Sequence, residues 1–171
     1  EIQDLKRAEA YYLKAIENGT KAINSEATFQ LGLMYYNYFD TKEKEADALK
    51  LFNVSANNGH LSSMVALGHF YLSQSDVEAF SWFSKAAEQQ DPEALFLSGQ
   101  MLFWGRGITK NIPQAIKRIQ DSAAFNYMEA NEFLGTMYGF DYLETNDYSE
   151  AIYFLNRAIE LGSEDAAINL S

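Results

Sequence analysis

The sequence predicts an all-α fold, a right-handed α/α superhelical solenoid of stacked antiparallel helix pairs, and three observations carry this prediction. First, a box of Ala or Ser, three residues, Leu-Gly, two residues and Tyr contains Gly32, Gly68 and Gly135, and a weaker copy contains Gly99. Second, these glycines are 36, 31 and 36 residues apart, a period typical of helical repeats. Third, each box is followed by small or apolar residues at the i, i+4, i+7 spacing of one helix face.

The box predicts a helix A and the spaced residues predict a helix B that packs against it. A glycine inside a helix is unfavourable by about 1 kcal/mol relative to Ala, so its recurrence at one register indicates close helix packing. Helix B tends to close on a turn residue, which is Gly19, Gly59 or Gly162, and Gln90 and Asn126 occupy the equivalent places. Gly or Asn just past a helix end can take the left-handed conformation that caps it. The helix B slots hold Ala8, Tyr12 and Ala15; Ala48, Phe52 and Ser55; Ala79, Phe83 and Ala86; Ala115, Ile119 and Ser122; Ala151, Leu155 and Ala158.

Taken in order, the elements form one repeat domain over residues 1–171. A lone helix B is followed by a loop at 20–26, which we expect to be longer than the other turns between repeats. Within the first full unit, a solvated loop is expected from Asp40 to Asp47. Because the chain lacks an initial Met and starts inside a repeat, we interpret it as a piece of a longer protein. The expected segments are a half-unit at 1–20, units at about 27–60, 62–90, 93–126 and 129–162, and a half-unit at 164–171.

Composition narrows the classes of ligand. The chain has 13 Lys and Arg against 24 Asp and Glu, a net charge of −11, which disfavours nucleic acid. Cysteine is absent, so thiolate ligands and disulfides are excluded. A membrane-inserted segment is not expected, because no apolar run approaches 18 residues. Sequons at Asn18, Asn53 and Asn169 permit glycosylation without establishing it, and the compartment is left open.

No catalytic, cofactor or metal site is expected. His60 and His69 are the only histidines, and neither stands in a His-x-x-x-His or Glu-x-x-His pattern. A Gly-x-Ser-x-Gly nucleophile elbow is also absent. We interpret His60 as a surface residue of the turn after helix B, and His69 as a residue of helix A.

These patterns resemble the Sel-one-like repeat family, relatives of tetratricopeptide repeats, over nearly the whole chain. The closest loop match is 104–108, Trp-Gly-Arg-Gly-Ile, followed by Asn111 and Ala115; the helix B endings at 85–88 and 157–162 also fit. The second unit departs from the pattern, since it lacks the glycine-rich loop and is five residues short. The resemblance implies an interaction scaffold, because relatives act as adaptors between proteins.

In a solenoid of this kind the A helices form a concave wall, and the residues facing it are here largely aromatic. Contiguous exposed aromatic residues mark binding sites, so we expect a protein or peptide ligand, with Phe96 and Trp104 as anchors. Packing of these side chains within the chain, or a mistaken assignment of the face, are the alternatives. The predicted face comprises Phe29, Leu33, Tyr36, Val65, His69, Leu72, Phe96, Gln100, Phe103, Trp104, Glu132, Thr136 and Phe140.

The leading functional prediction is therefore a scaffold or adaptor. The runner-up is a regulatory or inhibitory subunit with one dedicated partner, for example a toxin-neutralising or enzyme-activating protein. An enzyme and a nucleic-acid-reading repeat are disfavoured. Ala10, Leu13 and Ile16 have no helix A before them, so a contact with a preceding helix or with another chain is expected at the open ends of the solenoid.

Overall fold

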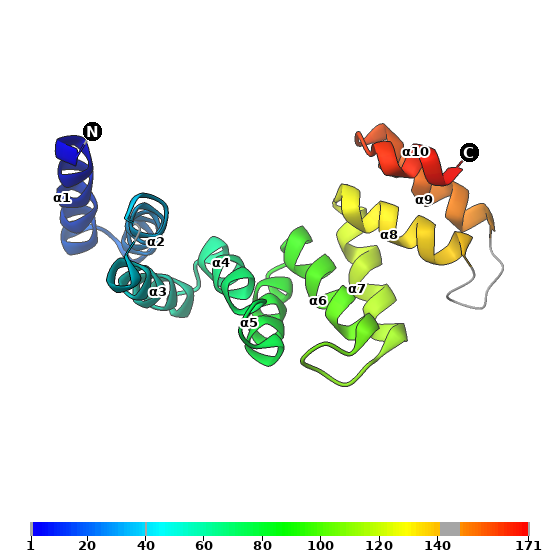
Figure 1. The fold of residues 1–171 in the computed structure, drawn as a ribbon, viewed down its shortest axis with the longest axis horizontal. Coiled ribbons are helices and arrows are strands. Elements are labelled where there is room, and N and C mark those ends of the chain that lie inside the picture. The colour runs from blue at the N-terminus through cyan, green and yellow to red at the C-terminus, as the bar shows by residue number, and fades with distance from the viewer. Residues whose placement is uncertain (1, 40, 141–147, 171) are drawn as a thin grey trace. The chain divides into compact units, whose positions relative to one another are not determined.

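The fold is all-α, as the sequence predicts. A computed structural model describes residues 2–39, 41–140 and 148–170, and over these residues it contains ten α-helices and no strand (Figure 1). The helices are α1 (Ile2–Asn18), α2 (Lys21–Tyr38), α3 (Lys42–Asn57), α4 (Leu61–Tyr71), α5 (Asp76–Glu88), α6 (Pro92–Trp104), α7 (Ile112–Ala124), α8 (Met128–Gly139), α9 (Tyr148–Glu160) and α10 (Glu164–Leu170).

The chain divides into two compact units. Unit 1 is Glu1–Ser75 and holds α1 to α4; unit 2 is Asp76–Ser171 and holds α5 to α10. Within each unit every helix packs against the next one along the chain, and in unit 2 α8 also contacts α10. The even-numbered helices are therefore the A helices of the repeat pattern, and the odd-numbered ones are the B helices.

The glycines of the boxes lie where helix A meets helix B, which confirms the physical basis of the repeat in three pairs. A Cβ atom added at these glycines would overlap a side chain of the paired helix, because the closest approaches are well below van der Waals contact. The pairs are Gly32 with Phe52 Cε1 at 2.7 Å, Gly99 with Ile119 Cγ1 at 2.6 Å, and Gly135 with Leu155 Cγ at 2.6 Å.

Four turns from helix B to the next helix A share one hydrogen-bond pattern. After α3, the Gly59 N–H donates to the Ala56 carbonyl at 2.9 Å and the His60 N–H donates to the Ser55 carbonyl at 3.1 Å. This pattern needs one residue with positive φ and satisfies the last carbonyls of the helix. The positive-φ residues of the four turns are Gly59, Gln90, Asn126 and Gly162.

The first turn is different, and two expectations about it are wrong. Gly19 is not among the residues with positive φ, and the loop expected at 20–26 is helical. Helix α2 begins at Lys21 because the Thr20 hydroxyl caps it, accepting a hydrogen bond from the Ile23 N–H at 3.5 Å.

The loop expected from Asp40 to Asp47 is helical from Lys42 onward, so that part of the expectation is wrong, whereas Lys42, Glu43 and Glu45 are exposed to solvent as expected. Asp40 lies outside the described residues. Helix α3 begins at Lys42, capped by Thr41, and acidic residues in its first turn favour the positive end of the helix dipole. Lys44 is half-buried, with its Nζ 3.7 Å from the centroid of the Tyr35 ring. The charged run is thus a helix start that also packs on α2.

The glycine-rich loop before α7 is fixed by its contacts with α5. Gly105 and Gly107 both have positive φ, and a Cβ at Gly107 would lie 2.2 Å from the Asp76 carbonyl oxygen. Between them, Arg106 Nη2 forms an ion pair with the Asp76 carboxylate at 2.6 Å. The loop therefore needs glycine for its backbone conformation and for its approach to α5.

Candidate functional site

In unit 1, three residues of the predicted binding face converge on one surface cavity. Leu33 and Tyr36 of α2 and His69 of α4 line a cavity of about 340 Å³, which we call the α2–α4 hollow. Tyr36 is 52% exposed and His69 is also exposed. The other residues lining the hollow are Glu45, Phe52, Ala66, Phe70, Ser73 and Gln74.

The remaining predicted residues of unit 1 are less accessible. Phe29 is half-buried and packs within the unit, with its ring centroid 5.7 Å from that of Phe52 and 4.9 Å from that of His60. Val65 and Leu72 are half-buried and do not line the α2–α4 hollow. The structure thus brings three of the six residues together at one accessible place.

In unit 2, the predicted face is largely packed within the chain. Phe96 is 7% exposed and Phe103 is 3% exposed, and both rings lie against Phe133 of α8, at centroid distances of 6.0 and 5.4 Å. Because both side chains are buried, neither the prediction that Phe96 anchors a partner nor the placement of Phe103 on the binding face agrees with the structure. For these two side chains the alternative of packing within the chain holds.

Two further predicted residues of unit 2 face α10. The Glu132 carboxylate accepts a hydrogen bond from the Ser163 hydroxyl at 2.9 Å, and the Thr136 hydroxyl accepts one from Asn169 Nδ2 at 3.5 Å. Both residues are half-buried. They therefore join neighbouring helices of unit 2.

Three predicted residues of unit 2 keep some access to solvent. Trp104 is 53% exposed, with its ring packed edge-on against Phe103 at 4.7 Å. Phe140, the C-cap residue of α8, is 65% exposed, and Gln100 is half-buried. Trp104 is therefore the predicted anchor that remains available in this unit.

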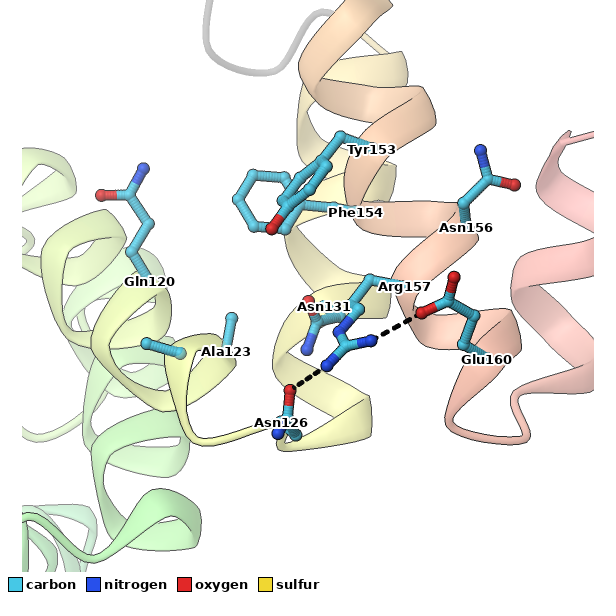
Figure 2. A pocket seen from close by; sticks show the side chains of 10 residues that line it. Gln120, Ala123, Asn126, Asn131, Tyr153, Phe154, Asn156, Arg157 and Glu160 are labelled. Atoms are coloured by element: carbon cyan, nitrogen blue, oxygen red, sulfur yellow. Dashed lines mark hydrogen bonds and ion pairs between the residues drawn. The ribbon is translucent and has the colours of Figure 1, made fainter.

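Sequence reasoning missed a second cavity, between the B helices α7 and α9 of unit 2 (Figure 2). It has a volume of about 580 Å³, and its walls carry the amides of Gln120, Asn126 and Asn156. Figure 2 shows Arg157 between Asn126 and Glu160; its Nη2 donates to Asn126 Oδ1 and its Nη1 pairs with the Glu160 carboxylate, both at 2.6 Å. The cation at this cavity is thus already paired.

A third cavity, of about 540 Å³, lies between α1 and α2. Its walls include Leu5, Tyr12 and Tyr38, and Leu33 borders both this cavity and the α2–α4 hollow. Leu13 on α1 is 50% exposed. Contact with another chain at this end stays a prediction.

His60 differs from the surface residue that we expected. Its ring is 16% exposed and bridges two helices, with Nδ1 at 2.9 Å from the Ser63 hydroxyl and Nε2 at 2.9 Å from the Glu26 carboxylate. Hydrogen bonds from Gln30 and then from His60 lower the pKa of the Glu26 carboxyl. Although serine, histidine and carboxylate stand in line, Ser63 is fully buried and cannot reach an external substrate. The arrangement joins α2 to the start of α4.

Two properties of the described residues bear on other functions. Among the described residues, no group of three or more histidine or acidic side chains is placed to hold a metal ion. Within the same part of the chain, none of the helices combines the length and the apolar character needed to cross a membrane.

Comparison with known proteins gives one family. A family model described as the Sel1 repeat matches residues 2–20, 25–60, 61–91, 92–117 and 129–163. The chain is 27% identical over 163 residues to an uncharacterized protein of Neisseria meningitidis serogroup B, and this match covers 95% of the chain and 34% of that protein. The chain thus spans about a third of the length of this relative.

Solved structures confirm the helical-repeat fold. A crystal structure of a Sel1 repeat protein from Oxalobacter formigenes matches with a TM-score of 0.81 at 24% identity, over 92% of this chain and 46% of that one. An immunity protein from Pseudomonas aeruginosa matches with a TM-score of 0.60 at 21% identity, over 94% of this chain and 58% of that one.

Proposed function

The chain belongs to the Sel1 repeat family, and from that premise we propose that it is a scaffold or adaptor that binds a protein or peptide on the face of its A helices. Proteins with Sel1 repeats generally mediate protein–protein interaction and are generally not enzymes. The observation that carries the proposal for this chain is the convergence of Leu33, Tyr36 and His69 on the α2–α4 hollow. Trp104 is the proposed contact in unit 2.

The chemistry of the hollow supports binding. Tyrosine supplies a large contact area with few rotatable bonds, and aromatic side chains dominate the energetics of interfaces. Tyr36 keeps about half of its surface exposed although α2 packs against both α1 and α3. Nucleic acid remains disfavoured as the ligand because of the net charge of −11.

The test is site-specific photocrosslinking in a native extract. A photoreactive phenylalanine analogue at position 36 should capture a discrete partner, whereas the same analogue at position 11 should not, because Tyr11 is 74% exposed but lines none of the cavities described above. The double variant Leu33→Ala, Tyr36→Ala should lose recovery of that partner while its circular dichroism stays helical. Equal capture from both positions contradicts the proposed site.

A regulatory or inhibitory subunit with one dedicated partner is the second candidate. The observation that favours it is the charge of unit 2, where six basic and fifteen acidic residues give a net charge of −9. Such a surface attracts one strongly basic partner over a long range. A single stoichiometric partner whose capture falls steeply with added salt would favour this candidate, and several partners sharing a short motif would favour the adaptor.

A further inference from the structure

We propose that the α2–α4 hollow is a receptor for the arginine side chain of a partner protein. This inference rests on the proposed function, because it names the chemistry of the ligand at the same site. It follows from three features of the hollow, which are an apolar floor, a carboxylate without an ion-pair partner among the described residues, and an exposed aromatic ring.

The floor of the hollow is apolar. Phe52 is only 4% exposed at its base, and Leu33 and Phe70 are half-buried beside it. The methyl group of Ala66 leaves the space open between α2 and α4. Long cationic side chains bury their methylene stems against such surfaces while the charged end stays at the rim.

The charge of the hollow comes from Glu45. Its carboxylate is exposed, and among the described residues it has no ion-pair partner. It lies in the first turn of α3, the end of a helix at which a negative charge interacts favourably with the helix dipole. The part of the chain that the structure describes places no Lys or Arg in the lining of the hollow. A carboxylate beside apolar surface, in a chain of net charge −11, selects a cation as the ligand.

The remaining polar groups favour a guanidinium over an ammonium ion. The exposed ring of Tyr36 offers a face on which a flat cation can stack. Ser73 and Gln74 add oxygen acceptors to the same cavity. A guanidinium presents five donors in a fixed fork and can serve Glu45 and a second acceptor together, whereas an ammonium ion acts as a point charge.

One resident cation competes for the carboxylate. Lys42 lies three residues before Glu45 on α3 and lines the adjoining cavity, which Tyr36 and Glu45 also border. A cation that borders the same cavity as the Glu45 carboxylate weakens the attraction of that carboxylate for an incoming guanidinium. Removing the charge of Lys42 should therefore tighten binding.

The experiment is a titration followed by two-dimensional NMR of the isotopically labelled chain, with Nα-acetyl-arginine amide as the probe. Saturable shifts are expected at the backbone amides around Leu33, Tyr36 and His69. The matched neutral probe, Nα-acetyl-citrulline amide, has nearly the same shape without the charge. It should bind at least about 5-fold more weakly, as expected for the loss of one charged hydrogen bond.

Variants assign the effect to the hollow. Glu45→Gln should weaken binding of the arginine probe by a similar factor, and Glu43→Gln, an exposed carboxylate on the same helix turn, should leave it unchanged. Lys42→Gln should strengthen binding. Ala66→Phe should abolish it by filling the hollow, and retained NMR dispersion shows that this variant folds.

The inference is overturned if the citrulline probe binds as tightly as the arginine probe, if Glu45→Gln has no effect, or if shifts scatter over the acidic surface. Its failure can be separated from that of the proposed function. A partner captured at position 36 with no preference for arginine defeats only the inference. A probe that binds in the hollow while no partner is captured there defeats the proposed function.

Discussion

The two units place the same register position of helix A in opposite environments. Tyr36 and Phe103 both stand four residues after the glycine of their box. Tyr36 is 52% exposed at the edge of the α2–α4 hollow, whereas Phe103 is 3% exposed in the core of unit 2. The register position of an aromatic residue on helix A therefore does not determine whether its side chain is exposed or buried.

The difference comes from the next helix A along the chain. Two residues before its glycine, α4 carries Ala66 and α8 carries Phe133. The ring of Phe133 meets Phe103 edge-on at 5.4 Å and fills the space between α6 and α8. A methyl group cannot fill that space, and at Ala66 a cavity of about 340 Å³ remains. The comparison teaches that a repeat offers a binding surface where its neighbour contributes a small side chain.

Charge separates the units as well. Unit 1 has seven basic and nine acidic residues, a net charge of −2, and unit 2 has a net charge of −9. Most of the long-range attraction for a basic partner therefore arises from unit 2, while unit 1 has the accessible aromatic hollow. At physiological salt the attraction is screened over about 8 Å, so it affects the rate of encounter more than the final contacts.

The largest expected effect is that of Phe133→Ala, which should lower the free energy of unfolding by about 3 kcal/mol. Phe133 is half-buried, so we expect the low end of the range for truncating a packed phenylalanine, which removes apolar burial and leaves a cavity; two edge-on ring contacts are also lost. Urea unfolding followed by circular dichroism measures the change. Phe140→Ala is the matched control on the same helix, since Phe140 is 65% exposed. A loss below about 1 kcal/mol for Phe133→Ala would contradict the packing account of the comparison.

The glycines of the two units should also respond unequally. A Cβ at Gly135 would lie 3.0 Å from the Leu155 backbone nitrogen, which cannot move away without shifting α9. At Gly32 the nearest atoms belong to the Phe52 ring, at 2.7 Å and 2.9 Å, and a ring can turn. Gly135→Ala should therefore cost about 2 kcal/mol, within the range for overpacking, and Gly32→Ala should cost less. Thermal unfolding of both variants measures the order, and the reverse order would refute this account.

The repeat itself could be predicted from the sequence because helix pairing needs small residues at fixed registers. Gly32, Gly99 and Gly135 meet the paired helix as the period requires. Serine in a helix B slot has a further role that periodicity does not show. The Ser55 hydroxyl donates to the Ser25 carbonyl and the Ser122 hydroxyl donates to the Pro92 carbonyl, both at 2.6 Å.

Helix starts and site residues were harder to predict, because they depend on single contacts between repeats. Thr20 and Thr41 each cap a helix where a loop was expected, since capping depends on one side chain and leaves no periodic signal. Likewise, the register of Phe96 and Phe103 suggests an exposed face. Both rings are covered by the ring of Phe133. Because Phe133 lies more than 25 residues away in the sequence, the local pattern around Phe96 and Phe103 does not reveal this contact.

A smaller effect is expected at the turns. Gln90 in unit 2 has φ of 62°, in a position that Gly59 fills in unit 1. Gln90→Gly should raise the free energy of unfolding by about 0.5–1 kcal/mol. Glycine takes this conformation without strain, which stabilises the folded chain, but its greater conformational freedom in the unfolded chain offsets part of that gain. Gly59→Gln should lower it by a similar amount. Asn126→Gly should gain less, because Asn126 also accepts a hydrogen bond from Arg157. Equal gains at Gln90 and Asn126 in chemical denaturation would contradict this reasoning.

The smallest effect is spectroscopic and concerns one tyrosine in each unit. Burial, together with its hydrogen bond to the Glu9 carboxylate, raises the pKa of Tyr35 to about 12. Burial and the nearby charge of Glu129 raise the pKa of Tyr127 to about 12. Because both pKa values are raised in the folded chain, this contribution to stability is complete below pH about 10, the ordinary tyrosine pKa, and is lost as the pH rises towards 12.

Absorbance at 295 nm measures the ionisation of tyrosine, and Tyr35→Phe and Tyr127→Phe should each remove one late-ionising group. The causes of the two shifts can be separated. Glu9→Gln should lower the pKa of Tyr35 and leave that of Tyr127 unchanged, because the Tyr35 hydroxyl donates to this carboxylate and Glu9 is not among the causes of the Tyr127 shift. Added salt should lower the pKa of Tyr127, since it screens the charge of Glu129. If all tyrosines ionise together near pH 10, the burial and neighbouring charges described for Tyr35 and Tyr127 do not raise their pKa values, and this account is wrong.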